Sequence, residues 1–243
     1  MLKANDIGYW YDRQENSLFE HVNLEFKSGN SYAIVGQSGS GKTTFLSLLA
    51  GLDKPRAGQI ELNGEPINQL GLTKYRQSHV AIVFQSYNLF TYMSPLNNLL
   101  TAMAVTGSSH RGDKQFAMSM LSKLGITDDQ MTKNVQKLSG GQQQRVAIAR
   151  TMVCDAKIVV ADEPTGNLDE ENTKYVIEQF QKIAHDQHKC VIIVTHEPDV
   201  AAACDHAYRL AKHKFTALCQ MVLKDSFYPL EISSCGRSFL FFY

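Results

Sequence analysis

Apolar and polar residues follow two different periods along the chain. Residues 22–26 alternate between apolar and polar side chains, which predicts a strand with one buried face, as in an antiparallel sheet. Short continuous apolar runs instead predict strands that are buried in the core. These runs are residues 32–35, 79–84, 157–163 and 190–195. The chain therefore starts with antiparallel sheet and continues with buried strands.

Helical spacing is found between the predicted strands. It covers residues 45–50, 95–105, 113–124 and 172–184. Gly51, Gly107 and Gly125 follow the first three of these segments, as is common where helices end. The segments at 95–105 and 113–124 form a helical insert between the early and the late strands. Strands that alternate with helices predict an α/β fold class.

A glycine-rich loop joins the strand at 32–35 to the helix that follows it. Glycines allow backbone N–H groups to approach an anion, and the helix dipole adds positive potential at the same point. The last residues of the loop can reach the β- and γ-phosphates through Lys42 and bind Mg²⁺ through the Thr43 hydroxyl. The stretch predicts a phosphate-binding P-loop, with these candidate residues: Gly36, Ser38, Gly39, Ser40, Gly41, Lys42, Thr43 and Thr44.

A second stretch suited to anions begins at Ser139. Ser139, Gly140, Gly141 and Gln142 come directly before a helical pattern that includes Val146. A serine hydroxyl, glycine N–H groups and a helix dipole would together bind phosphate. A helix with an ordinary N-terminal cap explains the same residues, so both interpretations stay open at this point.

Polar residues end three of the buried strands, at the edge where open α/β sheets bind ligands. Asp162 is placed to hold Mg²⁺, and Glu163 is placed to polarise a water molecule against the γ-phosphate. Gln85 could contact Mg²⁺ or the attacking water, or it could be an ordinary loop residue. His196 can hydrogen-bond the γ-phosphate or the catalytic water.

Tyr11 is a candidate for contact with the nucleotide base. It lies just before the polar patch at residues 12–17 and could stack on an adenine ring. An ordinary core aromatic is an equally good interpretation of this residue.

Composition and charge exclude several classes of protein. Lys plus Arg and Asp plus Glu number 24 each, so no global field favours a nucleic-acid partner. No apolar run reaches the roughly 18 residues that a membrane-spanning helix needs, and residues 1–6 lack the apolar core of a signal peptide. The five cysteines form no C-x-x-C pair and are expected to be reduced cysteines of a cytosolic protein, mostly small core residues. His185 and His188 have the i, i+3 spacing of metal ligands but no nearby set of carboxylates and cysteines. We therefore expect a solvated turn there and not a metal site.

The ordered set of motifs resembles the nucleotide-binding subunit of an ABC transporter. Residues 36–43 correspond to its Walker A loop, Gln85 to its Q-loop and residues 138–142 to its signature motif. Residues 158–163 correspond to its Walker B strand with the catalytic glutamate, residues 167–169 to its D-loop and His196 to its H-loop. The resemblance covers about residues 2 to 210.

The resemblance implies a P-loop NTPase (RecA-like) core with a small antiparallel β-subdomain and an inserted α-helical subdomain. The core and β-subdomain would be residues 1–87 and 151–215, and the helical subdomain about 88–150. ATP and Mg²⁺ are the implied cofactors. Two copies would pair head to tail, so that residues 139–142 of one copy close over the γ-phosphate held by Lys42 of the other. A separate membrane permease would dock on residues 87–100, which places the chain in the cytoplasm at the inner face of the cell membrane.

Several stretches are similar to a subfamily of ATPases from lipoprotein-releasing and macrolide- or antimicrobial-peptide-exporting systems. They are residues 51–55, 84–89, 162–169 and 195–198. Some amino-acid importers share parts of this pattern, so an importer ATPase is one alternative, and a soluble or regulatory ABC ATPase is another. The substrate is not encoded in this chain, because its specificity resides in the permease.

The C-terminal end departs from the family pattern. After residue 210 the family usually has a glycine turn and one more strand, whereas residues 211–215 contain no glycine. We expect residues 216–243 to form an atypical tail. Packing on the body, contact with a membrane or partner, disorder and an aberrant terminus are all open interpretations of its aromatic end.

Overall fold

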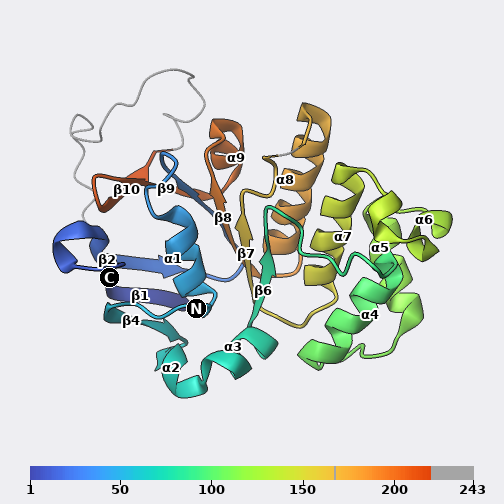
Figure 1. The fold of residues 1–243 in the computed structure, drawn as a ribbon, viewed down its shortest axis with the longest axis horizontal. Coiled ribbons are helices and arrows are strands. Elements are labelled where there is room, and N and C mark those ends of the chain that lie inside the picture. The colour runs from blue at the N-terminus through green and yellow to red at the C-terminus, as the bar shows by residue number, and fades with distance from the viewer. Residues whose placement is uncertain (167, 220–243) are drawn as a thin grey trace.

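The computed structural model describes residues 1–166 and 168–219, which form two sheets with helices around them (Figure 1). One sheet is antiparallel and has the strand order β2-β1-β4-β5. Its strands are β1 (Leu2–Trp10), β2 (Ser17–Phe26), β4 (Ala57–Leu62) and β5 (Glu65–Pro66). The antiparallel sheet predicted near the N-terminus is therefore confirmed.

The other sheet lies at the centre of the molecule and has the order β10-β9-β3-β8-β7-β6. Strands β9, β3, β8, β7 and β6 run parallel, and β10 pairs antiparallel with β9. Its strands are β3 (Ser31–Val35), β6 (Val80–Val83), β7 (Ile158–Asp162), β8 (Cys190–Thr195), β9 (His206–Ala211) and β10 (Lys214–Leu218). The α/β class predicted from the sequence is confirmed.

Side chains of the central sheet alternate between two hydrophobic cores. Val191 and Ile193 of β8 belong to the core shared with the inserted helices, whereas Ile192 and Val194 belong to the core shared with the antiparallel sheet. Helix α1 (Lys42–Leu49) contributes Phe45 to this second core. Because helices and sheet cover both faces, the central strands are continuously apolar in sequence.

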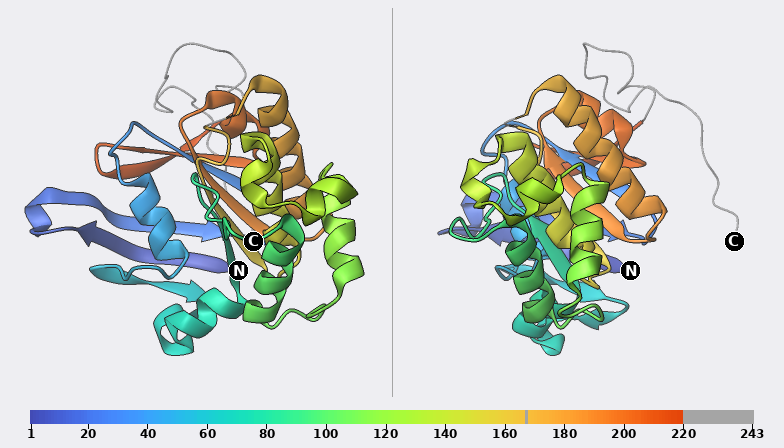
Figure 2. Two further views of the ribbon diagram at one scale, coloured as in Figure 1. Left: turned by 45° about the vertical axis from the view of Figure 1, so that its right-hand side comes forward. Right: turned by 90° about the vertical axis from the view of Figure 1, so that its right-hand side faces the viewer.

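The inserted helices gather at one side of the molecule, opposite the antiparallel sheet (Figure 2). Leu99, Leu121 and Ile148 are fully buried among them. Ser94 caps the first helix of the group at its N-terminus, and Gly107 ends it with a left-handed φ of 67°. The helices are α4 (Pro95–Thr106), α5 (Lys114–Lys123), α6 (Asp128–Thr132) and α7 (Gly140–Met152), so the helices predicted at 95–105 and 113–124 are present.

Short helices and one long helix complete the described fold. Asp169 caps α8 (Glu170–His185), which packs on α7, β3 and β8. The short elements are α2 (Ile67–Leu70), α3 (Leu72–Ser78), α9 (Pro198–Ala203) and the 3₁₀ turns η1 (Gln14–Asn16) and η2 (Val135–Lys137). In residues 1–166 and 168–219, no helix combines the length and the apolar character needed to cross a membrane.

Two details correct the sequence predictions for the histidines and the second strand. His185 is the last residue of α8 and its Nε2 lies 2.9 Å from Asp205 Oδ2, so it is not in a turn, whereas His188 is exposed in the segment after the helix, as predicted. Strand β2 begins at Ser17 and not at residue 22. The pattern missed its first residues because the left-handed φ of His21, 53°, interrupts the alternation of apolar and polar side chains. Phe19 and Val22 are consequently both buried although they are three positions apart.

The C-terminal departure from the family concerns the sequence and not the fold of residues 206–218. A turn and a further strand are present, with Lys212 at a φ of 48° and His213 at 64° in the positions where hairpins favour glycine. The boundary predicted after residue 215 is wrong, because it falls inside β10 (Lys214–Leu218). Residues 220–243 of the predicted tail, with Cys235, lie outside the described residues.

Candidate active site

The glycine-rich loop between β3 and α1 presents the open N-terminus of a helix. Gly41 is the N-cap of α1 with a φ of 101°, and no side chain caps the first turn. Gly39 also has a left-handed φ, of 79°. A Cβ on Gly36 would lie 2.5 Å from the carbonyl oxygen of Leu210, so the loop can leave the sheet here only with glycine. The uncapped N–H groups and the helix dipole make this loop suited to an anion.

Lys42 holds the loop in shape from inside. Its Nζ donates to the carbonyl oxygens of Gly36 (2.8 Å) and Gln37 (3.0 Å), and the side chain is buried. Ser38 and Gly39 are exposed at the tip of the loop. The Ser40 hydroxyl is buried without a hydrogen-bond partner among the described residues. At the place where the sequence predicted phosphate binding, the loop thus surrounds the Lys42 ammonium group with carbonyl oxygens. The Ser40 hydroxyl there has no hydrogen-bond partner among the described residues.

Thr43 and Asp162 bring the loop and the end of β7 together. Thr43 Oγ1 donates to Asp162 Oδ1 over 3.1 Å. Burial raises the pKa of Asp162, the neighbouring charge of Glu163 raises it further, and Thr43 and Lys42 lower it. The Thr43 hydroxyl and the Asp162 carboxylate, which come from different elements, thus lie side by side at the carboxyl edge of the central sheet.

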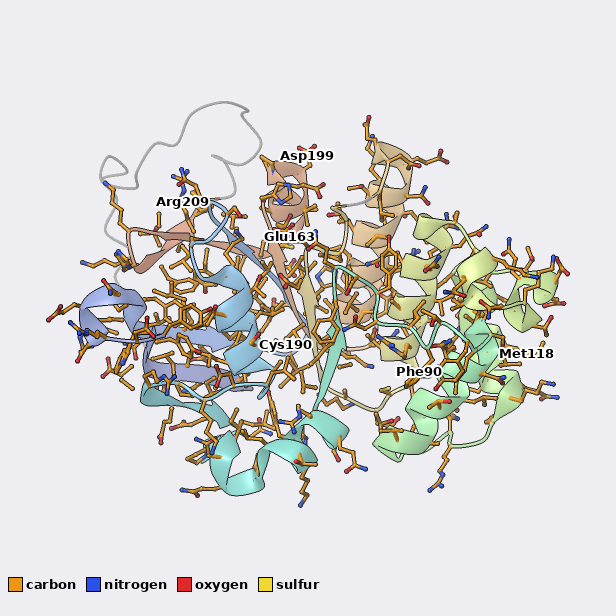
Figure 3. All side chains as sticks on the ribbon, in the orientation of Figure 1. Phe90, Met118, Glu163, Cys190, Asp199 and Arg209 are labelled. Carbon is orange, nitrogen blue, oxygen red and sulfur yellow. The ribbon has the colours of Figure 1, made fainter. Side chains whose placement is uncertain are left out.

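Glu163 and His196 meet beside this point. Glu163 Oε1 lies 3.3 Å from His196 Nδ1, and the Glu163 N–H donates to the carbonyl oxygen of Val194 over 2.9 Å. Glu163 has a φ of 43°, a strained value for a side chain of this size. Figure 3 shows Glu163 at the opposite end of the strands from Cys190, which begins β8.

Gln85 reaches the same place from β6. A Cβ on Gly166 would lie 3.6 Å from Gln85 Nε2 and 3.7 Å from Glu163 Oε2, so both side chains approach this glycine. The structure therefore brings Gln85, Asp162, Glu163 and His196 together, as predicted from their positions after parallel strands. Asn167, in the predicted D-loop, lies outside the described residues.

The stretch from Ser139 to Gln142 forms the first turn of a different helix. The Ser139 hydroxyl accepts from the Gln142 N–H over 3.3 Å, and Gln142 Oε1 accepts from the Ser139 N–H over 2.9 Å, which is a capping box. Gly141 packs close to Asn172 of α8, and Gly140 packs near the Tyr87 hydroxyl. Helix α7 contacts α4, α5, α8 and β6. In the described residues no hydrogen bond or ion pair joins this turn to Lys42 or Thr43, so one chain keeps its two anion-suited loops apart (Figure 1).

Tyr11 lies near the glycine-rich loop on the side of the antiparallel sheet. Its ring is 62% exposed, and its hydroxyl lies 3.0 Å from Thr44 Oγ1 in α1. Tyr9 packs edge-on against it with ring centroids 5.4 Å apart. The interpretation of Tyr11 as a buried core aromatic is therefore wrong, and an exposed, oriented ring is available for stacking.

The donor set at Thr43 and Asp162 fits Mg²⁺. A hydroxyl and a carboxylate are the hard oxygen ligands that this ion takes from proteins when it also binds nucleotide phosphates. The described residues contain no group of three or more His, Cys, Asp and Glu side chains arranged to hold a metal ion by themselves, and an ion shared with phosphates does not need one.

Two contacts near the site were not predicted from the sequence. Thr165 is buried, and its Oγ1 donates to Glu197 Oε1 over 2.6 Å, which ties the loop after Glu163 to the loop after β8. Arg150 of α7 donates to the carbonyl oxygens of Asn88 (2.6 Å) and Tyr87 (3.0 Å). Both contacts join residues far apart in the chain, and no local pattern reveals them.

Comparison with known proteins identifies the family. The family model described as "ABC transporter" matches residues 19–166, which contain the glycine-rich loop, Gln85, the Ser139 turn and Glu163. The chain belongs to the ABC transporter family. It is an ABC transporter ATPase that binds ATP, as the sequence resemblance implied.

The matches to curated relatives extend over most of this chain and over nearly the whole length of each relative. An uncharacterized ABC transporter ATP-binding protein, YclH of Bacillus subtilis, is 48% identical over 89% of this chain and 96% of its own. The lipoprotein-releasing system ATP-binding protein LolD of Chromohalobacter salexigens is 36% identical over 86% of this chain and 90% of its own. The LolD relative confirms the resemblance to lipoprotein-releasing ATPases.

Solved structures confirm the P-loop NTPase fold. The dimeric structure of MJ0796, described as a bacterial ABC transporter cassette, superposes with a TM-score of 0.79 at 30% identity. It covers 90% of this chain and 99% of its own. A second structure of that cassette is a dimeric post-hydrolysis state bound to ADP and Pi.

Proposed function

We propose that this chain is the ATPase subunit of an ABC exporter and that it energises a separate membrane permease. The observation that carries the proposal is the pair of contacts at the carboxyl edge of the central sheet, Thr43 with Asp162 and Glu163 with His196. These contacts assemble a site with a phosphate loop, oxygen ligands and a carboxylate base from three separate elements.

In the proposed reaction Glu163 acts as general base. Its carboxylate accepts a proton from the water molecule whose oxygen attacks the γ-phosphorus, and the bond from that phosphorus to the β–γ bridging oxygen breaks with its electron pair leaving on ADP. Lys42 stabilises charge on the phosphate oxygens, and His196 orients the base and the γ-phosphate. Thr43 and Asp162 would hold Mg²⁺, and Gln85 would contact it or the water. When bound, this ion neutralises phosphate charge.

We propose that two copies of the chain complete the site. The turn at Ser139 keeps its own serine hydroxyl, glycine N–H groups and helix dipole on α7, away from the Lys42 loop of the same chain. A second copy in head-to-tail orientation would place this turn over the γ-phosphate. The dimeric cassette MJ0796, which shares the fold, supports this arrangement.

The proposed docking face for the permease is the surface around α4, as the sequence predicted for residues 87–100. Three large apolar side chains there are exposed, Phe90 by 41%, Tyr92 by 73% and Val105 by 62%. Figure 3 shows Phe90 on the helical side of the molecule. Buried Asn98 accepts from the Phe90 N–H and donates to its carbonyl oxygen, which holds the backbone at Phe90 in place.

The direction of transport is proposed to be export of lipoprotein, peptide or drug-like substrates. The similarity to LolD, a component of a lipoprotein-releasing system, supports this direction. The chain would then work as a peripheral subunit in the cytoplasm, at the inner face of the cell membrane.

Isolation of the complex tests the proposal. The tagged chain, purified from its own cells in mild detergent, should bring down one integral membrane protein in stoichiometric amount. ATP hydrolysis by this complex in liposomes should exceed that of the chain alone, and the Glu163→Gln complex serves as the inactive control. A chain whose hydrolysis is the same with and without any membrane partner would contradict the transport role.

A further inference from the structure

A groove lies between the helical part and the central sheet, next to the proposed docking face. Its volume is about 380 Å³, and most of its lining is apolar. Its lining includes Ile82 in β6 and Phe84 directly after that strand. Val105 of α4 and Cys154, two residues after the end of α7, also line it. The lining also includes Arg76 of α3 and Arg150 of α7, which come from two separate helices.

Among the residues that the structure describes, both arginines bond only to neutral oxygen atoms. Arg76 Nη1 donates to the Gly51 carbonyl oxygen (2.6 Å), and its Nη2 donates to Thr73 Oγ1 (3.4 Å). Arg150 uses one N–H from each Nη for the Asn88 and Tyr87 carbonyl oxygens. In the described part of the chain no carboxylate forms an ion pair with either residue.

The carboxylate of Asp155, beside the groove lining in the chain, already accepts hydrogen bonds from another residue. Asp155, next to Cys154 in the chain, accepts from the Ser109 N–H (2.7 Å) and from the Ser109 hydroxyl (3.1 Å). Burial of the guanidinium lowers the pKa of Arg150, and the neighbouring Cys154 thiol offsets only part of this effect. The groove is therefore apolar and carries positive charge that the described residues leave uncompensated.

We propose that the permease segment seated in this groove carries a carboxylate among apolar residues, and that this carboxylate pairs with Arg76 and Arg150. The inference rests on the proposed function and adds the chemistry by which the partner is recognised. An Asp or Glu side chain on one face of a short amphipathic helix fits the lining, since its apolar neighbours would cover Phe84 and Val105.

A carboxylate is the acceptor that these arginines favour. Each guanidinium has five N–H donors, so N–H groups remain after the carbonyl contacts, and a carboxylate can accept two of them in parallel. Apolar side chains of the seated segment would cover the lining, shield the pair from water and so strengthen it. A neutral amide at the same place would leave both positive charges without a counter-charge once the seated segment covers them, which is costly.

An ion pair between Arg150 and the permease carboxylate would also affect the candidate active site. Arg150 holds the carbonyl oxygens of Tyr87 and Asn88, whose φ values of 62° and 46° are strained for these side chains. These two residues follow Gln85 closely in the chain. A carboxylate that shares Arg150 would weaken its hold on this strained turn and so change the position of Gln85. Arg150 is in this sense a positioning residue.

Photocrosslinking in the whole complex identifies the occupant. Benzoylphenylalanine is placed at Val105, on the exposed rim of the groove, and the complex is irradiated in native membranes. The expected product joins Val105 to a cytoplasmic segment of the permease that has Asp or Glu between apolar residues. A crosslinked permease segment without any carboxylate overturns the inference but leaves the proposed function intact. Absence of any membrane-protein crosslink, together with ATPase activity that no membrane partner changes, overturns both.

Substitutions then test the pair itself. Arg76→Gln, and amide replacement of the crosslinked carboxylate, should each lower the permease-dependent rise in ATPase activity by at least about tenfold. Arg76→Lys should keep a larger part of it, because the charge remains. Arg111→Gln, on the exposed loop before α5, is the matched control and should change nothing. Normal stimulation in both amide variants would overturn the pairing, and thermal unfolding of each variant shows that it is folded.

Discussion

His196 Nδ1 lies 3.3 Å from Glu163 Oε1, so the residue after β8 meets the residue after β7 across neighbouring parallel strands. Parallel pairing of Asp162 with Val194 fixes this relation, because both strands end at the same edge of the sheet. The strained φ of Glu163, 43°, turns its side chain into this contact and not into the core. Sheet register thus sets the relation between the proposed base and its proposed orienting partner.

Glu163→Gln should abolish turnover, with a fall in kcat of about 10²- to 10⁴-fold, because the amide cannot accept the proton of the attacking water. The same variant should accumulate as an ATP-bound dimer, which light scattering after size exclusion with ATP would detect. Steady-state phosphate release gives the rate. Hydrolysis at the wild-type rate would mean that Glu163 is not the general base.

Ser139→Arg should remove ATPase activity, roughly hundredfold or more, while ATP affinity at the Lys42 loop changes little. The reason is that in the proposed dimer the substituted turn serves the partner copy and not its own P-loop. Isothermal titration with ATP and phosphate release together separate the two effects. Ser139→Thr, which keeps a capping hydroxyl, is the control. Loss of ATP binding in Ser139→Arg would argue against a site shared between two copies.

Tyr11→Ala should weaken ATP binding about tenfold, because stacking of a base on an aromatic ring contributes on the order of 1–3 kcal/mol. Tyr11→Phe keeps the ring and loses only the contact of the hydroxyl with Thr44, and so should bind ATP nearly as well as the wild type. Fluorescence titration with a labelled ATP measures both. Equal affinity in the alanine variant would show that the base binds elsewhere.

Alkaline pH should destabilise the fold through its buried thiols. Cys190 is buried, and burial raises its pKa from 9.0 to about 12. The unfolded chain therefore loses this proton first, so the stabilising contribution is complete below about pH 9 and is lost as the pH rises toward 12. Between these values the free energy of unfolding should fall by about 1.4 kcal/mol per pH unit for this thiol.

Urea unfolding at several pH values checks this slope. Cys190→Ala should reduce the slope by one thiol's share, whatever its effect on stability at neutral pH. Cys219→Ala is the control, because Cys219 is exposed and should leave the slope unchanged. An identical slope in wild type and Cys190→Ala would exclude this thiol as the source.

Much of the local structure was predictable from neighbouring residues. Strand β8 occupies the predicted residues 190–195, and α7 begins directly after Ser139, because apolar runs and capping residues act within a few positions. Helix α8 starts at Glu170 and not at residue 172, since Asp169 caps it. The turn at Lys212 and His213 was missed because it adopts left-handed φ values without glycine.

The sequence by itself determined the parts of the site: a phosphate loop, a capped turn at Ser139 and polar residues after buried strands. These are local features, set by glycine conformations, helix caps and hydrophobic period. Only the tertiary structure decided which parts meet. Sheet order places β7 and β8 side by side, and helix packing places Arg150 against the carbonyl oxygens of Tyr87 and Asn88. Such contacts depend on long-range packing of the cores, which no short stretch of residues specifies.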